Sequence, residues 1–114
     1  MPVITLNGAW NKMSMSAVIA LDRVLKVAIQ EIPELGLKAD EVSCLFNVPF
    51  MCDEKEAIVF VDSLYEKPLR TAEVRERLAT VICNCVARHF NLNIEVFVRP
   101  FKPDNGFASF RRGT

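Results

Sequence analysis

The spacing of apolar and polar positions changes along the chain, and each change marks a predicted element. Apolar residues recur at intervals of three and four over residues 14–32, which predicts a helix with one buried face. Residues 42–50 alternate between apolar and polar, and 57–61 are continuously apolar, so both segments are typical of strands. A second helical period runs from Thr71 to His89. The remaining strand-like segments are 2–7 and 94–101.

Local signals place the ends of the predicted helices. Ser14 or Ser16 can cap the first helix, because a serine oxygen accepts a hydrogen bond from a free backbone N–H of the first turn. Pro33 and Gly36 end that helix, and Pro68 and Thr71 open the second. The predicted order is therefore strand, helix, strand, strand, helix, strand.

The two halves of this order resemble each other in sequence. Leu6–Lys12 matches Val61–Lys67 at apolar, polar, small, aromatic and lysine positions, and Asn47–Phe50 matches Val98–Phe101. We therefore predict one α+β domain over 1–114, built from two βαβ units in a βαββαβ order. Its parts are the halves 1–51 and 56–102, then a tail, 103–114, with a short C-terminal strand.

Two helices on one face of a four-stranded sheet leave the other face uncovered. Phe46, Phe60 and Phe97 indicate that this second face is partly apolar. An exposed apolar sheet is normally covered by a partner, so the sequence favours an oligomer.

Composition and charge narrow the classes of function. Apolar residues make up 51% and charged residues 25% of the 114 residues, which fits a folded single domain. Lys plus Arg (14) balance Asp plus Glu (14), so nothing favours nucleic acid. No apolar run approaches the roughly 20 residues of a membrane span, and the N-terminus does not resemble a signal peptide. We expect a cytoplasmic protein with no membrane contact.

The four cysteines do not predict a disulfide framework or a metal centre. Cys83 and Cys85 are two apart in a helical segment, so their side chains point in different directions. His89 follows Cys85 by four residues, but it is the only histidine and completes no set of three or four ligands. We place it at the edge of the buried stripe of the second helix, and we expect neither a metal nor a cofactor.

The most informative position for chemistry is Pro2. If Met1 is removed, Pro2 has a free secondary amine at the start of a buried strand and can act as a general base. If Met1 is retained, the Pro2 nitrogen is a tertiary amide and cannot accept a proton. The plain alternative is that proline is tolerated as the first residue of a strand, where its missing N–H is not needed.

With its two βαβ units, Met1–Pro2 start and short terminal strand, the chain resembles the tautomerase superfamily, which includes 4-oxalocrotonate tautomerase and macrophage migration inhibitory factor. The resemblance implies a homotrimer with the amino-terminal proline at the base of a pocket between subunits. It also implies proton shuttling on a small anionic 2-oxo or enol acid, whose carboxylate is held by cationic side chains.

The resemblance assigns roles to four residues of this chain. Pro2 matches the catalytic proline, and Lys38 falls where larger members have a pocket lysine before the second strand. Gly106-Phe107 resembles a glycine-aromatic pair that lines the pocket, so Phe107 is a candidate wall. A tyrosine and an asparagine expected on the last strand are not evident. Arg99 stands there instead, and its guanidinium can bind a carboxylate bidentately.

Each of these side chains also has an ordinary structural role. Arg99 can form a surface or interface salt bridge, Lys38 can be an exposed loop lysine, and Phe107 can pack the tail. If the site is real, apolar surroundings and a nearby Arg99 or Lys38 are expected to lower the pKa of the Pro2 amine.

Two other classes of protein fit the same pattern. One is a non-catalytic trimeric binding or scaffold protein with the same fold. The other is a ferredoxin-like module, which has the same βαββαβ order. Strand order distinguishes the two folds, and the state of the Pro2 nitrogen distinguishes the enzyme from the scaffold.

Overall fold

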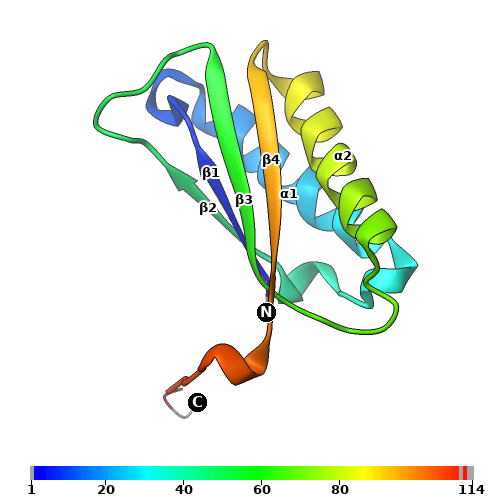
Figure 1. Ribbon diagram of the computed structural model, residues 1–114. Helices are drawn as coiled ribbons and strands as arrows, with labels where there is room; N and C mark the ends of the chain where they lie inside the picture. The colour runs from blue at the N-terminus through cyan, green and yellow to red at the C-terminus, as the bar shows by residue number, and fades with distance from the viewer. Residues whose placement is uncertain (1, 111, 113–114) are drawn as a thin grey trace.

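The main elements follow one another in the predicted order (Figure 1). The computed structural model describes residues 2–110 and 112. Its helices and strands are β1 (Val3–Asn7), α1 (Met15–Gln30), β2 (Ser43–Asn47), β3 (Glu56–Tyr65), α2 (Ala72–His89) and β4 (Asn93–Phe101). Short 3-10 turns occur at η1 (Trp10–Lys12), η2 (Pro33–Leu35), η3 (Ala39–Glu41) and η4 (Pro103–Asn105). The predicted α+β class is confirmed.

The sheet has the strand order β2-β1-β3-β4. β1 runs parallel to β2, and β3 runs parallel to β4, so the two strands of each βαβ unit are direct neighbours. The two units join through β1 and β3, which are antiparallel, with Val3 opposite Asp62. In a split βαβ arrangement another strand lies between the parallel pair. The observed order therefore excludes the ferredoxin-like alternative.

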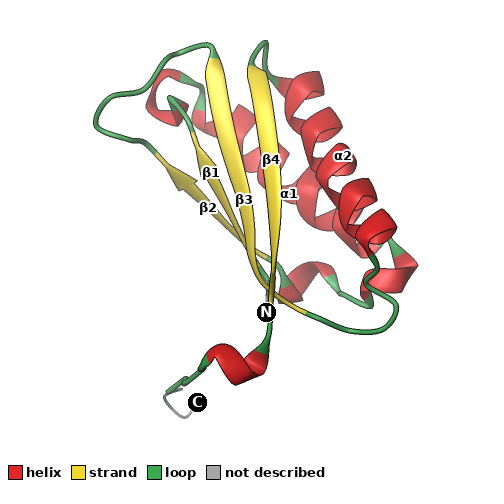
Figure 2. Cartoon of the chain, in the orientation of Figure 1, coloured by secondary structure: helices red, strands yellow, loops and turns green. Residues whose placement is uncertain are grey.

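Both helices lie on one face of the sheet, as Figure 2 shows, and side-chain caps fix where they begin. The Ser14 hydroxyl accepts a hydrogen bond from the Ala17 N–H at 3.2 Å, and the Thr71 hydroxyl accepts one from Val74 at 3.3 Å. The core lies between the helices and the sheet. Its fully buried residues include Ile4, Leu6, Leu21, Leu25, Val59, Val61, Leu78 and Ile82.

Three sequence expectations about individual elements are wrong. β2 ends at Asn47, short of the predicted Phe50, because Pro49 has no N–H for a ladder hydrogen bond, and the Phe50 side chain is fully exposed. His89 is exposed, and its Nδ1 lies 2.9 Å from the Cys85 carbonyl oxygen. Phe46 faces the helices, where its ring lies 5.3 Å from that of Trp10.

The open face of the sheet is partly apolar, as expected from Phe60 and Phe97. These two rings stack across β3 and β4 with centroids 5.6 Å apart. Leu45 on β2 and Ile58 on β3 are exposed. The apolar strip therefore reaches both edge strands, and it is interrupted on β1 by Thr5, which lies between Leu45 and Phe60.

The predicted C-terminal strand is absent from the described part of the tail. Residues 102–110 contain only the η4 turn. Figure 1 shows the tail running off the end of the sheet, where it has no strand edge to pair with. A strand needs such an edge for its backbone hydrogen bonds.

The cysteines are free thiols. Burial raises the pKa of the Cys44 thiol to about 12, with a further contribution from the negative charge of Asp22, and burial also raises the pKa of Cys85. Neither thiol is an activated nucleophile. None of the helices among residues 2–110 and 112 combines the length and apolar character that a membrane crossing needs.

Candidate functional site

Pro2 is buried at the start of β1. Its carbonyl accepts a hydrogen bond from the Ser43 N–H at 3.1 Å, which ties it to β2. On one side it contacts a small apolar cavity whose walls include Ile4, Val61 and Leu78. On the other side it lines a larger cavity of about 120 Å³. We call the larger one the Pro2 pocket, and its lining is Pro2, Leu37, Glu41, Ser63, Tyr65, Lys67 and Arg70.

The central cation of the Pro2 pocket is Arg70, which is only 6% exposed. Its Nε and Nη2 donate to the Leu35 carbonyl at 3.2 and 2.7 Å, and its Nη1 donates to the Tyr65 carbonyl at 2.8 Å. Burial lowers the pKa of the Arg70 guanidinium, while the charge of Glu41 acts in the opposite direction. Because these three hydrogen bonds go to neutral carbonyls, they orient the guanidinium without neutralising it.

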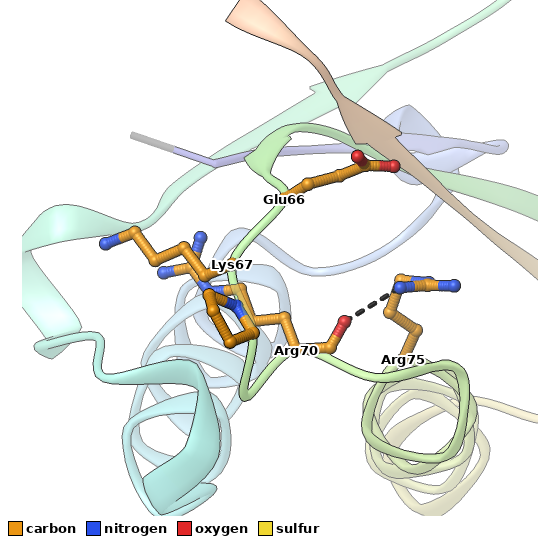
Figure 3. A pocket seen from close by; sticks show the side chains of 5 residues that line it. Glu66, Lys67, Arg70 and Arg75 are labelled. Carbon is orange, nitrogen blue, oxygen red and sulfur yellow. Dashed lines mark hydrogen bonds between the residues drawn. The ribbon is translucent and has the colours of Figure 1, made fainter.

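Lys67 adds a second cation that is exposed and has a long side chain. Lys67 and Arg70 also line an open hollow of about 450 Å³ with Glu66, Pro68 and Arg75 (Figure 3). Arg75 is held there because its Nη1 donates to the Arg70 carbonyl at 2.7 Å, which Figure 3 marks with a dashed line. The lining of this hollow therefore includes three positive side chains and one carboxylate, and it shares Lys67 and Arg70 with the Pro2 pocket.

Glu41 places a carboxylate in the same pocket as Pro2. Its Oε1 accepts a hydrogen bond from the Lys38 backbone N–H at 2.9 Å, so the η3 turn fixes its position. The pocket thus joins a proline, a carboxylate and two cations, which are residue types suited to moving a proton on an anion.

Ser63 lies where β3 contains an irregularity. Val61 pairs with Val98 and Leu64 with Pro100, so Asp62 and Ser63 lie opposite the single residue Arg99. This is a β-bulge, and Ser63 adopts a positive φ of 61° in it. Ser63 also lines a neighbouring hollow of about 390 Å³, which we call the Arg99 pocket. Its other lining residues are Asp62, Arg99, Pro100, Phe101, Asn105 and Phe107.

The structure separates the four predicted site residues. Arg99 and Phe107 line the Arg99 pocket, whereas Pro2 lines the Pro2 pocket. Lys38 is exposed and lines neither of these two pockets, although its backbone N–H binds Glu41. Met1, on which a free Pro2 amine depends, lies outside the described residues.

Arg99 is already engaged by a carboxylate. Its Nε and Nη2 donate to the two oxygens of Asp62, both at 2.7 Å, and its guanidinium lies 4.1 Å from the Phe60 ring centroid. The hydrogen bonds that Arg99 donates to Asp62 raise the pKa of the Arg99 guanidinium. Phe107 packs edge-on against Tyr65, with ring centroids 6.0 Å apart, so the plain packing role applies to it as well.

Sequence reasoning missed Glu41, Lys67 and Arg70. The signal that could have found Lys67 and Arg70 is the antiparallel pairing of β1 with β3, which brings the end of β3 beside the start of β1. Any cation soon after β3 then lies near Pro2. That pairing is not visible in the periodicity of either strand.

No protein-family model matches the chain, and no curated protein matches its sequence. Solved structures do resemble it. A member of the cis-3-chloroacrylic acid dehalogenase family aligns with a TM-score of 0.73 and 15% identity, over 93% of this chain and 79% of that chain. A fused 4-OT wild-type asymmetric trimer aligns with a TM-score of 0.74 and 11% identity, over 94% and 91%.

A third similar structure is a malonate semialdehyde decarboxylase inhibited by 3-bromopropiolate. It aligns with a TM-score of 0.64 and 15% identity, over 96% of this chain and 89% of that chain. At these identities the likeness concerns the fold. The strand order, the two helices on one face and these alignments together show that the chain has the fold of the tautomerase superfamily.

Proposed function

We propose that this chain is a proton-transfer enzyme of the tautomerase type, acting on a small 2-oxo or enol acid. Pro2 is the general base once Met1 has been removed. The observation that carries the proposal is the position of Pro2, buried in a pocket that also contains Arg70 and Lys67.

The surroundings of Pro2 suit a base that works near neutral pH. Burial penalises a charged ammonium and therefore lowers the pKa of an amine. The positive charges of Arg70 and Lys67 act in the same direction, and the Glu41 carboxylate in the same pocket acts against them. A pKa close to the working pH gives the best combination of a free base and a strong driving force for proton transfer.

The same two cations can hold the carboxylate of the substrate. Arg70 supplies a fixed positive charge, and Lys67 can reorient to meet the anion. The pocket of about 120 Å³ favours an acid of only a few carbon atoms. We assign Glu41 to proton exchange on the far side of the substrate, since its carboxylate lines the same pocket.

The remaining predicted residues keep proposed roles at the edge of this site. Arg99 can bind an anion if Asp62 releases it, and Phe107 can form a wall of the neighbouring pocket. Lys38 can approach only as an exposed side chain beside Glu41. These three assignments stay predictions.

We also propose that the chain forms a homotrimer through the open face of its sheet. The apolar strip that includes Leu45, Ile58 and Phe97 needs cover, and the similar fused 4-OT structure is a trimer. The cytoplasmic location stays a prediction.

A non-catalytic trimeric binding protein is the second candidate. The closed Arg99–Asp62 ion pair favours it, because a cation expected to bind substrate is already neutralised. The two candidates differ in the state of the Pro2 nitrogen and in turnover.

The test begins with mass spectrometry of protein produced without a tag, to establish whether Met1 is gone. An NMR titration of the Pro2 nitrogen should then give a pKa well below the about 8 of an ordinary chain terminus. The protein should enolise small 2-oxo acids, and the pH dependence of the rate should show this pKa. A variant with an N-terminal extension holds the Pro2 nitrogen in a peptide bond. Its kcat/KM should be lower by about 10² to 10⁴, the usual contribution of a general base.

Pro2→Ala is the matched control, because it retains a terminal amine but removes the proline ring. A blocked nitrogen in the natural protein, or a pKa at or above about 8 without turnover, would favour the binding protein.

A further inference from the structure

The outer surface of α1 is unusually apolar for a helix in the exposed layer of a small domain. Met15, Ile19, Val24 and Val27 are 74%, 44%, 39% and 50% exposed. α2 lies beside α1 and is fully described, yet none of its large apolar residues is exposed. Of the two helices, α1 is therefore the one with an exposed apolar surface that a partner can cover.

Two of these four residues, Val24 and Val27, line a groove of about 380 Å³ between α1 and α2. Val24, Val27 and Ala28 line its apolar part, while Arg23, Glu31 and Arg88 are its charged groups. We call this the α1 groove. The helices that form it lie on one face of the sheet (Figure 2), whereas Leu45, Ile58 and Phe97 are exposed side chains of the strands.

Two of the charges of the α1 groove, Arg23 and Glu31, are placed symmetrically about Val27. Arg23 precedes Val27 by four residues and Glu31 follows it by four, so both lie near the same stripe of the helix. Asp22 pairs with Lys26 and Glu34 with Arg77 inside the protomer. Among the described residues, neither Arg23 nor Glu31 takes part in such an ion pair.

We propose that the α1 groove binds a second copy of this chain, with the two α1 helices antiparallel across a two-fold axis at Val27. A two-fold interface is self-complementary, so every contact between two different residues occurs twice, once in each direction between the protomers. Arg23 of each copy then lies opposite Glu31 of the other, with the valines between them. The groove supplies an apolar centre and, on α1, one charge of each sign four residues from Val27, while Arg88 of α2 adds a second positive charge.

This association is independent of the sheet face and of the proposed activity. Because the two surfaces lie on opposite layers, pairing through the α1 groove adds to whatever assembly the open sheet face forms. A trimer formed through the sheets presents three such grooves, so each of them can link it to a further copy.

The test measures mass by light scattering on a sizing column and by sedimentation over a range of protein concentrations. The wild-type chain should show a species of at least twice the mass of the Val27→Glu variant. Arg23→Glu alone and Glu31→Arg alone should each raise the dissociation constant of this pairing by about tenfold or more. Each variant places like charges opposite one another twice. The double variant Arg23→Glu/Glu31→Arg should restore it.

Lys55→Glu is the matched control, since it reverses a charge in the β2–β3 loop away from the groove and should leave the doubling unchanged. Circular dichroism of every variant verifies that it is folded. A wild-type mass equal to that of Val27→Glu at all concentrations would overturn the proposal. Single variants that dissociate without rescue in the double variant would overturn the antiparallel pairing.

Discussion

The Pro2 pocket and the Arg99 pocket meet at Ser63, and each contains an arginine, but the two arginines are held in opposite ways. Arg70 is buried and donates to the carbonyls of Leu35 and Tyr65. Arg99 is exposed and donates to both oxygens of Asp62. The same residue type therefore contributes a positive charge to one pocket and a neutral ion pair to the other.

This difference shows that the partner of an arginine decides whether it can recruit an anion. A carbonyl orients a guanidinium through its dipole and leaves the net charge in place. A carboxylate cancels that charge and must be displaced before another anion can bind. An anionic substrate should therefore prefer the pocket that contains Pro2.

The difference between the two arginines should appear most strongly in the stability of the fold. Arg70→Met should lower the free energy of unfolding by about 2 to 4 kcal/mol, because the buried Leu35 carbonyl and the partly buried Tyr65 carbonyl lose their donors. Urea denaturation followed by circular dichroism measures the change.

Arg99→Met is the matched control for this measurement. It removes the same group from an exposed ion pair, so it should change the free energy of unfolding much less. Equal losses in the two variants would contradict the distinction between the two arginines.

The next effect concerns binding and rests on the proposed function. Lys67→Gln should raise KM for a small 2-oxo acid by about tenfold or more with less change in kcat, because a charged hydrogen bond to the carboxylate is lost. Arg99→Gln should leave KM nearly unchanged, since Asp62 already occupies that guanidinium. Steady-state kinetics at fixed ionic strength measure both.

Asp62→Asn tests the same difference between the Pro2 pocket and the Arg99 pocket. It removes the negative charge that occupies Arg99, so a small carboxylate should gain affinity for the Arg99 pocket. A larger rise in KM for Arg99→Gln than for Lys67→Gln would reverse the assignment of the two pockets.

The part of the structure that the sequence predicted is the part that depends on local spacing. The periods of α1 and α2 and their caps at Ser14 and Thr71 are properties of neighbouring residues, and they are confirmed. The repeated βαβ pattern gave the order of the elements. Pro2 was selected as the working group from the same local view, and that choice stays a prediction.

The rest of the site depends on how distant strands are paired. The antiparallel register of β1 and β3 brings Pro2 beside Ser63 and the loop with Lys67 and Arg70. At the bulge, Ser63 lines both pockets and Asp62 lines the Arg99 pocket. No periodicity predicts an extra residue in one strand, so Asp62 could not be named as the partner of Arg99, and the role of Arg99 in binding a substrate carboxylate stays a prediction.

The smallest expected effect concerns the bulge that separates the two pockets. Ser63 has a φ of 61°, a left-handed conformation that costs a residue with a Cβ atom about 1 kcal/mol or more. Ser63→Gly removes this cost but gives the unfolded chain more freedom, so the free energy of unfolding should rise by at most about 1 kcal/mol. Ser63→Val should lower it by about 1 kcal/mol, because a β-branched residue fits this conformation least well. Urea denaturation of both variants measures the pair, and a Val variant as stable as the Gly variant would mean that the bulge does not hold Ser63 in this conformation in solution.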